Sequence, residues 1–254
     1  MTSTDLPTGY LLTQRFEIKR LQLARIQRSH FAMKLALRFL AAAILFPHGG
    51  IPIAAAKTVV IPVTSFDSQA TFDAHWTYNY PWGGTDHNGS ARMNKSQVTI
   101  ANSTLTITAK RVNGEKPASH DGKQIAIKYL SGAIGAREHF NVTRGGGFDF
   151  SAELRATTTR GTWPAFWLTG VKGWPPEIDM AEWKGSGKIS FNTFNTSSQV
   201  RARDVNYPSP GDFHKIRCEI RDQNGRDVAI KFFMDEKLIE TQYGRGFVGQ
   251  PMYL

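Results

Sequence analysis

The sequence predicts an all-β protein in which two antiparallel sheets pack face to face. Apolar residues alternate with other residues in short stretches, of which the clearest are Leu105–Ala109, Phe148–Leu154, Ile216–Ile220 and Val228–Phe232. Such alternation is typical of strands with one buried face. Turn-forming pairs such as Asn113-Gly114 and Asn224-Gly225 separate the stretches. After residue 57 no segment keeps a helical period over three turns, so we expect a β-sandwich.

The composition indicates one domain and argues against a nucleic-acid partner. The chain has 254 residues, a length that a single β-sandwich can use. The net charge is +10, but the first 56 residues hold seven basic and two acidic residues, which leaves +5 for residues 57–254. That excess is mild and contains no Lys/Arg block. Aromatic residues make up 11% of the chain and include six Trp, a content that suits stacking on sugar rings.

The first 56 residues are predicted to lie outside the domain, as an N-terminal extension and a secretory signal peptide, and residues 57–254 to form the sandwich. Met33 begins a basic start and a short apolar core that runs to Phe46, and Ala54-Ala55-Ala56 supplies the small residues that a signal peptidase needs. We therefore expect synthesis to begin at Met33, and the mature protein to be secreted, extracellular or in the cell wall. The alternative is an organelle-targeting peptide, because Arg15 to Arg28 is basic and almost free of acids.

Two further features bear on the secreted form. The apolar run is too short to span a bilayer, so the mature protein is predicted to have no membrane segment. Asn-x-Ser/Thr sequons begin at Asn88, Asn94, Asn102, Asn141 and Asn195, which fits a secreted glycoprotein.

Cys218 is the only cysteine and alternates with Ile216 and Ile220, so it is predicted to be a buried inert thiol.

Three acids in the segment from Glu177 to Glu182 carry the chemical argument. On a helix Glu177 and Asp179 would lie about 200° apart, so no helical face would collect them. On a strand these two share a face. Glu182 joins them if one extra residue is inserted at Met180 or Ala181 as a β-bulge, with Ile178 pointing into the sandwich.

Carboxylates that share one face repel each other, a cost that a purely structural strand has no reason to bear. Retaining hydrolysis of a glycosidic bond needs such a set. One carboxylate attacks the sugar carbon while a second, about 5–5.5 Å away, protonates the departing oxygen and later activates water. Between them, Asp179 is placed to hydrogen-bond the nucleophile and to separate the two pKa values, so that Glu177 is ionised and Glu182 keeps its proton.

The surrounding segment resembles the family 16 glycoside hydrolases. Gly161-Thr162-Trp163-Pro164-Ala165-Phe166-Trp167 is similar to that family's G-x-W-P-A-x-W strand, and Trp174-Pro175-Pro176 leads directly into the acids. Weaker resemblance runs from Phe72 to Leu254 and includes the stretch from Asn88 to Met93. It covers most of residues 57–254.

The resemblance implies a β-jelly roll with a sugar-binding cleft on its concave sheet. It matches Glu177 to the nucleophile, Asp179 to the assisting acid and Glu182 to the acid/base. Two residues between Asp179 and Glu182 are similar to the laminarinase branch, which implies hydrolysis of β-1,3- or mixed β-1,3/1,4-glucan. No cofactor is implied as necessary. Relatives often carry a structural calcium, for which we assign no ligands, and the enzyme is expected to act as a monomer on a polysaccharide.

Four other residues are predicted to bind substrate: Trp163, Trp174, Asn88 and Asn192. At least one of Trp163 and Trp167 is expected in the core, since packing in the core is the ordinary role of a large aromatic side chain. A glycan on Asn88 would conflict with binding in the cleft. His87 and His120 are interpreted as loop residues.

Two departures from the family affect these expectations. Phe191 to Phe194 contains no histidine where many relatives have one, which leaves the glycan open. The chain stops at Leu254 where the family continues through further strands, so we expect a truncated sequence with an uncovered sheet edge.

Three other functions remain open from sequence. A catalytically silent carbohydrate-binding jelly roll would bind glycan without cleaving it. A cell-wall transglycosylase would use the same carboxylates, and a polysaccharide lyase would use a Tyr or His base.

Overall fold

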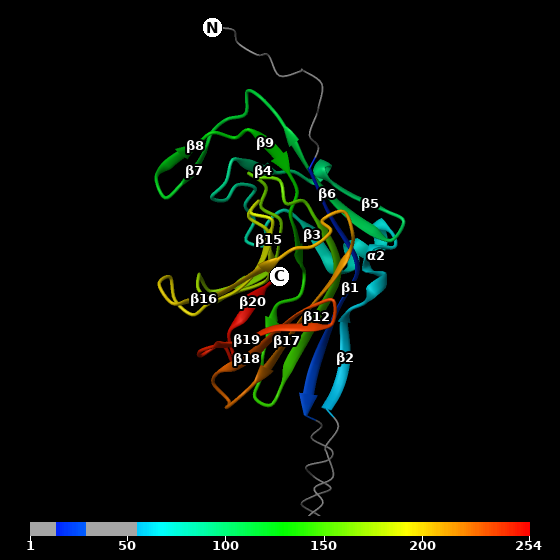
Figure 1. The fold of residues 1–254 in the computed structure, drawn as a ribbon, viewed down its shortest axis with the longest axis vertical. Coiled ribbons are helices and arrows are strands. Elements are labelled where there is room, and N and C mark those ends of the chain that lie inside the picture. The colour runs from blue at the N-terminus through cyan, green and yellow to red at the C-terminus, as the bar shows by residue number, and fades with distance from the viewer. Residues whose placement is uncertain (1–13, 29–54) are drawn as a thin grey trace, which may run out of the picture.

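The computed structural model describes residues 14–28 and 55–254. Its two main sheets pack face to face (Figure 1), which confirms the predicted all-β jelly-roll sandwich. Within the described residues, no helix is both long and apolar enough to cross a membrane.

The larger sheet has ten strands. Its order is β19 (Lys237–Gly244), β18 (Val228–Met234), β17 (His214–Asp222), β12 (Gly147–Ala156), β1 (Gln14–Arg28), β6 (Thr104–Arg111), β9 (Tyr129–Ser131) and β4 (Ala91–Met93), with β2 (Ala55–Ile61) paired to β1 and β5 (Val98–Ala101) paired to β6.

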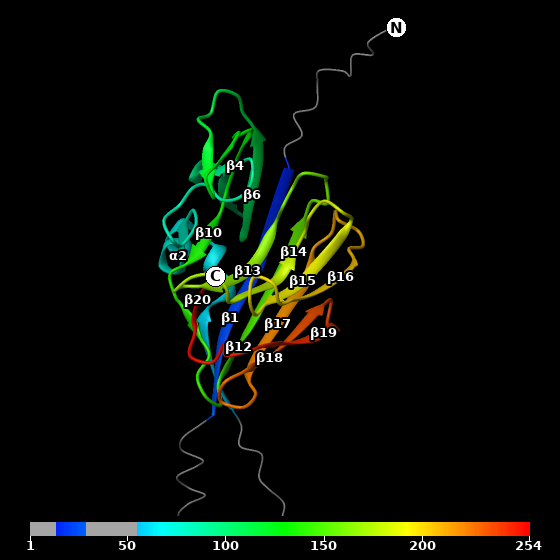
Figure 2. The same ribbon diagram turned by 90° about the vertical axis from the view of Figure 1, so that its left-hand side faces the viewer.

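The smaller sheet has six strands and is seen across its face in Figure 2. Its order is β11 (Phe140–Asn141), β20 (Pro251–Tyr253), β13 (Ala165–Gly170), β14 (Glu177–Glu182), β15 (Lys188–Phe194) and β16 (Val200–Asn206). The remaining elements are two short pairs, β3 (Trp76–Tyr78) with β10 (Ile134–Ala136) and β7 (Ala118–His120) with β8 (Lys123–Ile125), together with helix α2 (Gln69–His75) and the 3-10 turns η2 (Val63–Phe66) and η3 (Lys95–Gln97).

Period-two alternation builds the core between the sheets. Along β12, every second residue from Phe148 to Ala156 is buried. Cys218 of β17 is fully buried beside them, as predicted, and burial raises the pKa of its thiol. From the smaller sheet, Ile178 and Phe191 fill the other side. Burial of these apolar side chains is the main term that holds the two sheets together.

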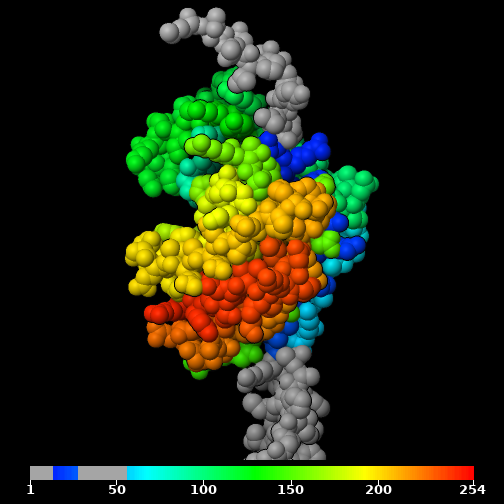
Figure 3. All heavy atoms as spheres, viewed as in Figure 1, coloured from blue at the N-terminus to red at the C-terminus, as the bar shows by residue number. Residues whose placement is uncertain are grey.

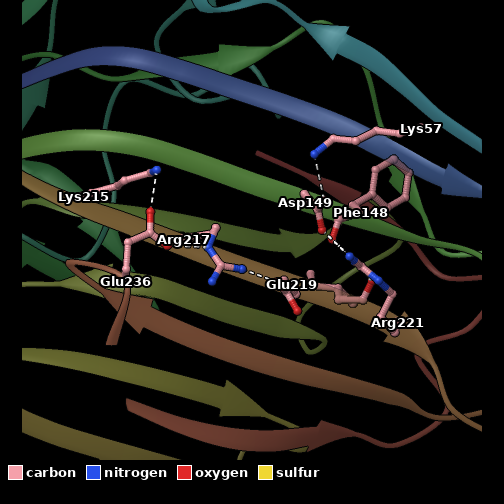
Figure 4. Close-up of polar contacts among 9 residues, drawn as sticks. Lys57, Phe148, Asp149, Lys215, Arg217, Glu219, Arg221 and Glu236 are labelled. Atoms are coloured by element: carbon pink, nitrogen blue, oxygen red, sulfur yellow. Dashed lines mark hydrogen bonds and ion pairs between the residues drawn. The ribbon is translucent and has the colours of Figure 1, made fainter. Parts of the chain in front are cut away.

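The outward-facing residues of β17 are charged and paired (Figure 4). Arg221 pairs with Asp149 of β12, which also accepts a hydrogen bond from Lys57 at 3.1 Å. Farther along the strand, Lys215 contacts Glu236 at 2.5 Å. These exposed pairs keep one face of the larger sheet polar, while each contributes little to stability.

The expectation that all of residues 1–56 lie outside the domain is wrong for β1. This strand pairs with β12 on one side and with β6 and β2 on the other. Leu21, Leu23 and Ala24 are buried in the core. The reason is local: Phe16 and Ile18 before the irregularity at Lys19–Gln22, and Leu21 and Leu23 beyond Arg20, supply one buried face, whereas from the sequence we assigned this stretch to an extension ahead of the leader. The predicted signal peptide itself falls mainly on residues outside the described part.

Candidate active site

A β-bulge on β14 brings the three acids to one face of the smaller sheet. Asp179 pairs with Trp167 of β13 and Ala181 pairs with Phe166, so Met180 is the extra residue. The register with β15 shifts in the same place. The predicted bulge is therefore present.

On the two faces of β14 the residues separate as the bulge requires. Ile178, Met180 and Ala181 are buried in the core. The acids Glu177 and Glu182 lie on the opposite face, together with Asp179. Figure 3 shows this side of the molecule hollowed between the segment that carries β7 and β8 and the segment that carries β15 and β16.

Asn192 of β15 ties two of the acids together. Its Nδ2 donates to Asp179 Oδ2 at 2.8 Å and to Glu182 Oε2 at 2.9 Å. Asn192 is only 2% exposed. Because one nitrogen serves both carboxylates, the two acids occupy one small space and cannot turn away from each other without losing a hydrogen bond.

The outer acids each accept a hydrogen bond from a tryptophan. Trp163 Nε1 donates to Glu182 Oε1, and Trp174 Nε1 donates to Glu177 Oε2 at 3.0 Å. Both tryptophan residues are more than half exposed, at 56% and 51%. A large ring held at the edge of a carboxylate and open to solvent can stack on a sugar while it orients the acid.

Burial and mutual repulsion shift the acids away from their usual titration. Burial, followed by the charge of Asp179, raises the pKa of Glu177 to about 8. Burial, followed by the charge of Glu182, raises the pKa of Asp179 to about 7. These two coupled groups therefore bind protons at a higher pH than free carboxyl groups do.

Glu182 has a different environment, since it is the acid with the most donors. It accepts from Trp163 and Asn192, and Lys184 Nζ lies 2.7 Å from its Oε2. These three donors hold the Glu182 carboxylate in place. The expectation that Glu177 is ionised is not met in the free protein at neutral pH, because burial and the charge of Asp179 raise the pKa of Glu177 to about 8.

Aromatic side chains border the acids on the β13 side. The ring centroid of Trp167 lies 6.0 Å from that of Trp82. The Trp82 ring in turn stacks on Tyr80, with the centroids 4.7 Å apart and an angle of 8° between the ring planes. His87 joins this group at 6.3 Å from Trp167, and Tyr253 of β20 lies 6.4 Å from Trp82. Burial and the charge of His120 lower the pKa of His87, so its ring is neutral at pH 7. Trp82 remains 41% exposed and available for stacking.

The predicted binding residues have different surroundings. Trp163 and Trp174 lie beside the acids, as already described. Asn192 is buried between two carboxylates, so in the free protein it contacts acids and not the open cleft. Asn88 is exposed, and within residues 14–28 and 55–254 no recorded hydrogen bond joins it to the three acids.

The expectation that Trp163 or Trp167 belongs to the core is wrong. Trp163 is 56% exposed, and Trp167 faces Trp82 and His87 and lies outside the buried cluster. Phe166 and Leu168 fill the core from β13 instead. Alternation along this strand would have placed both tryptophans on one face, and the neighbouring apolar residues identify that face as the outer one.

Sequence reasoning missed Lys184 and the group of Trp82, Trp167 and Tyr253. Lys184 had a signal, because it lies two residues after Glu182 with the apolar Trp183 between them. The aromatic group had none, since its members come from a loop and two strands that only the fold brings together. Over the described residues, no group of three or more His, Cys, Asp or Glu side chains is arranged to hold a metal ion.

The fold and the clustered acids define the class of protein, a β-sandwich glycoside hydrolase. Residues 85–246 match the family described as "Glycosyl hydrolases family 16", and the chain belongs to that family. The resemblance seen in the motifs is thereby confirmed.

Two curated relatives and one solved structure are similar to the chain. The galactan endo-beta-1,3-galactanase of Flammulina velutipes is 48% identical over 218 residues, which cover 85% of this chain and 86% of the relative. The endo-1,3-1,4-beta-glycanase EglC of Rhizobium meliloti (strain 1021) is 35% identical over 162 residues, 61% of this chain and 32% of the relative. Porphyranase B from Zobellia galactanivorans matches with a TM-score of 0.53 and 16% identity, covering 71% of this chain and 72% of that one, which bears on the fold alone.

Proposed function

We propose that the protein is a retaining endo-hydrolase of β-1,3-linked galactan. The observation that carries the proposal is the bulged strand β14, which presents Glu177, Asp179 and Glu182 on one face between exposed aromatic rings. Membership of the family supports the hydrolase, and the galactan-cleaving relative at 48% identity supports the substrate.

In the first step of the proposed reaction, a Glu177 oxygen bonds to the anomeric carbon while the bond to the leaving oxygen breaks. Glu182 gives its proton to that oxygen, and the aglycone leaves as an alcohol. In the second step Glu182 takes a proton from water, the water oxygen bonds to the anomeric carbon, and Glu177 is released as a carboxylate. Two displacements at one carbon retain its configuration.

The first step needs a proton arrangement that the free protein disfavours. Glu177 has to be the anion, although burial and Asp179 raise its pKa to about 8. The positive charge that develops on the sugar offsets the cost of ionising Glu177. The reaction therefore starts from the minor population in which Glu177 is ionised.

The glycan was expected from sequence to be a β-1,3- or mixed β-1,3/1,4-glucan. We propose galactan instead because the relative that shares 48% identity matches 86% of its own length, whereas the 1,3-1,4-glycanase relative matches 32%. Release of reducing ends from β-1,3-galactan, laminarin and mixed-linkage β-glucan tests the choice. Preference for either glucan would contradict it and restore the earlier expectation.

Two substitutions test the hydrolase itself. Glu177→Gln and Glu182→Gln are each expected to reduce release of reducing ends by at least about 1,000-fold, since each removes one partner of the double displacement. Glu236→Gln, a change at an exposed acid on the opposite side of the sandwich, is the matched control and should keep full activity. Azide is expected to restore turnover to Glu177→Gly as a glycosyl azide. Full activity in either Gln variant would contradict the proposal, and products longer than the substrate would indicate the transglycosylase.

A further inference from the structure

The segment from Val112 to Lys128 forms an arm that borders the cleft on the side opposite β15 and β16. It leaves the larger sheet after β6, contains the hairpin of β7 and β8, and returns at β9. Figure 1 shows this green segment reaching out on the same side of the molecule as β16, and Figure 3 shows the hollow between them. The arm is therefore one wall of the hollow.

A row of rings connects the arm to the acids. Trp167 pairs with Asp179 across β13 and β14, so the two side chains share the outer face of the smaller sheet. The ring centroid of His87 lies 6.3 Å from that of Trp167 and 5.7 Å from that of His120 on β7. The side chain of His120 is 39% exposed, and Trp82, which also contacts His87, is 41% exposed. The row thus presents open ring surface at the end that is farther from the acids.

Arg92 of β4 fastens the arm to the loop that carries the middle of this row. Its Nε and Nη2 donate to the two carboxylate oxygens of Asp86 at 2.8 and 3.0 Å. Its Nη1 donates to Glu115 Oε2 at 2.9 Å, and Nη2 also donates to the backbone oxygen of Lys116 at 3.0 Å. Asp86 adjoins His87 in the aromatic loop, whereas Glu115 and Lys116 lie in the arm just before β7. One guanidinium therefore joins the loop to the arm.

The arm has little apolar burial of its own. Between residues 112 and 128 only Ala118 and Ile127 are buried. The side chains of Arg92, Asp86 and Glu115 are 24%, 28% and 30% exposed, so water screens their attraction less than that of a fully exposed pair. A guanidinium also fixes the angle between its partners, because its donors form a rigid planar fork. The position of the arm relative to the loop therefore depends on Arg92.

We propose that the arm binds the glycan, that His120 and Trp82 contact a sugar unit farther along the chain than those beside the acids, and that Arg92 is the positioning residue for this contact. The inference rests on the proposed function and deepens it, because it makes the protein selective for long chains of β-1,3-galactan. Flat rings such as indole and imidazole can lie against the C–H face of a sugar, and only a chain that extends past Trp167 reaches these two.

The test is the affinity for β-1,3-galactobiose and for β-1,3-galactohexaose, measured by calorimetry in the Glu177→Gln background so that neither oligomer is cleaved. Arg92→Gln is expected to raise the Kd of the hexaose about 5- to 10-fold more than that of the biose, since loss of aromatic contacts has an effect of this size. His120→Ala and Trp82→Ala should show the same selectivity. Arg226→Gln, at a side chain that is 81% exposed in the turn between β17 and β18, is the matched control and should change neither Kd.

A double variant distinguishes positioning from direct contact. If Arg92 acts through the arm, the hexaose Kd of Arg92→Gln combined with His120→Ala should be close to that of the single variants. Additive losses would mean that Arg92 does not act through His120, and would overturn its assignment. Arg92→Lys keeps the charge but not the fork, so it should also lose most of the selectivity for the hexaose.

The outcomes separate this inference from the proposed function. Equal increases in Kd for both oligomers, or no change in either with His120→Ala and Trp82→Ala, would overturn the inference. These two side chains are partly exposed, so they keep the test valid if Arg92→Gln fails to fold. The proposed function depends on a different result, because failure of the unmodified protein to release reducing ends from β-1,3-galactan would contradict it.

Discussion

Asn192 shows how one side chain can make a cluster of acids tolerable. Its amide donates to Asp179 and Glu182 at once, while it is itself 2% exposed. Charged acceptors strengthen such hydrogen bonds, so they offset part of the repulsion between carboxylates. The sequence placed Asn192 on the strand next to the acids, but its partners depended on the register between β14 and β15, which alternation alone does not determine.

At the same scale, the raised pKa of Glu177 predicts a pH-dependent stability. Its pKa is about 8 in the folded protein and near 4.5 when unperturbed. Between these values the unfolded chain releases a proton that the folded chain keeps, so rising pH favours unfolding. We expect Glu177→Gln to be more stable than the unmodified protein at pH 8 by about 1–2 kcal/mol, and the gain to vanish near pH 4.5.

Urea unfolding of both proteins at the two pH values measures this difference. Glu236→Gln is a control of opposite sign, because a hydrogen bond from Lys215 lowers the pKa of Glu236. That carboxylate stabilises the fold above its unfolded pKa, and its loss should lower stability at pH 8. An equal effect of Glu177→Gln at both pH values would show that its carboxylate is not desolvated by folding.

At the scale of the element, the bulge on β14 decides whether the acids can act together. The bulge was predictable because the insertion of a single residue is enough to make Glu177, Asp179 and Glu182 share a face. Which residue is inserted was not predictable, since Met180 and Ala181 are both apolar and both buried. The pairing with β13 identifies Met180.

Deleting Met180 tests the bulge directly. The regular strand that results would keep Glu182 on the face of Glu177 and Asp179, but it would shift Glu182 by one residue relative to its partners on β13 and β15 and remove the fully buried Met180 side chain from the core. We expect loss of hydrolysis and a melting temperature lower by at least about 5 °C. Deletion of Ser198, in the exposed turn between β15 and β16, is the control and should keep activity. Unchanged activity after loss of Met180 would mean that the acids do not depend on the bulge.

For the whole molecule, the sandwich was predictable, but the full set of strands that form it was not. Alternation identified β12, β17 and β18 because each has one buried face. The place of β1 was not recognised, because a basic strand ahead of a leader-like segment resembles a targeting sequence. The leader motif predicts synthesis from Met33 and a mature protein that starts near Lys57, whereas the pairing of β1 with β12 and β6 predicts that Gln14–Arg28 is part of the folded protein.

Leu23→Ala distinguishes these alternatives. Leu23 is fully buried on β1, so its truncation should lower the free energy of unfolding by about 2–4 kcal/mol. Leu238→Ala, on β19 where the side chain is 50% exposed, should change it by less than about 0.5 kcal/mol. Equal stability of Leu23→Ala and the unmodified protein, with an N-terminus near Lys57, would support the leader and exclude β1 from the mature fold.

The most direct test of the catalytic assignment is to trap the covalent intermediate. An aryl 2-deoxy-2-fluoro glycoside of β-1,3-galactobiose should transfer its sugar to the nucleophile, and the aryl oxide should depart as the leaving group. The resulting glycosyl-enzyme should hydrolyse slowly enough for peptide mass mapping. We expect the sugar on Glu177, and product from the natural substrate with retained anomeric configuration by NMR. A label on Asp179 or Glu182, or an inverted product, would contradict the account.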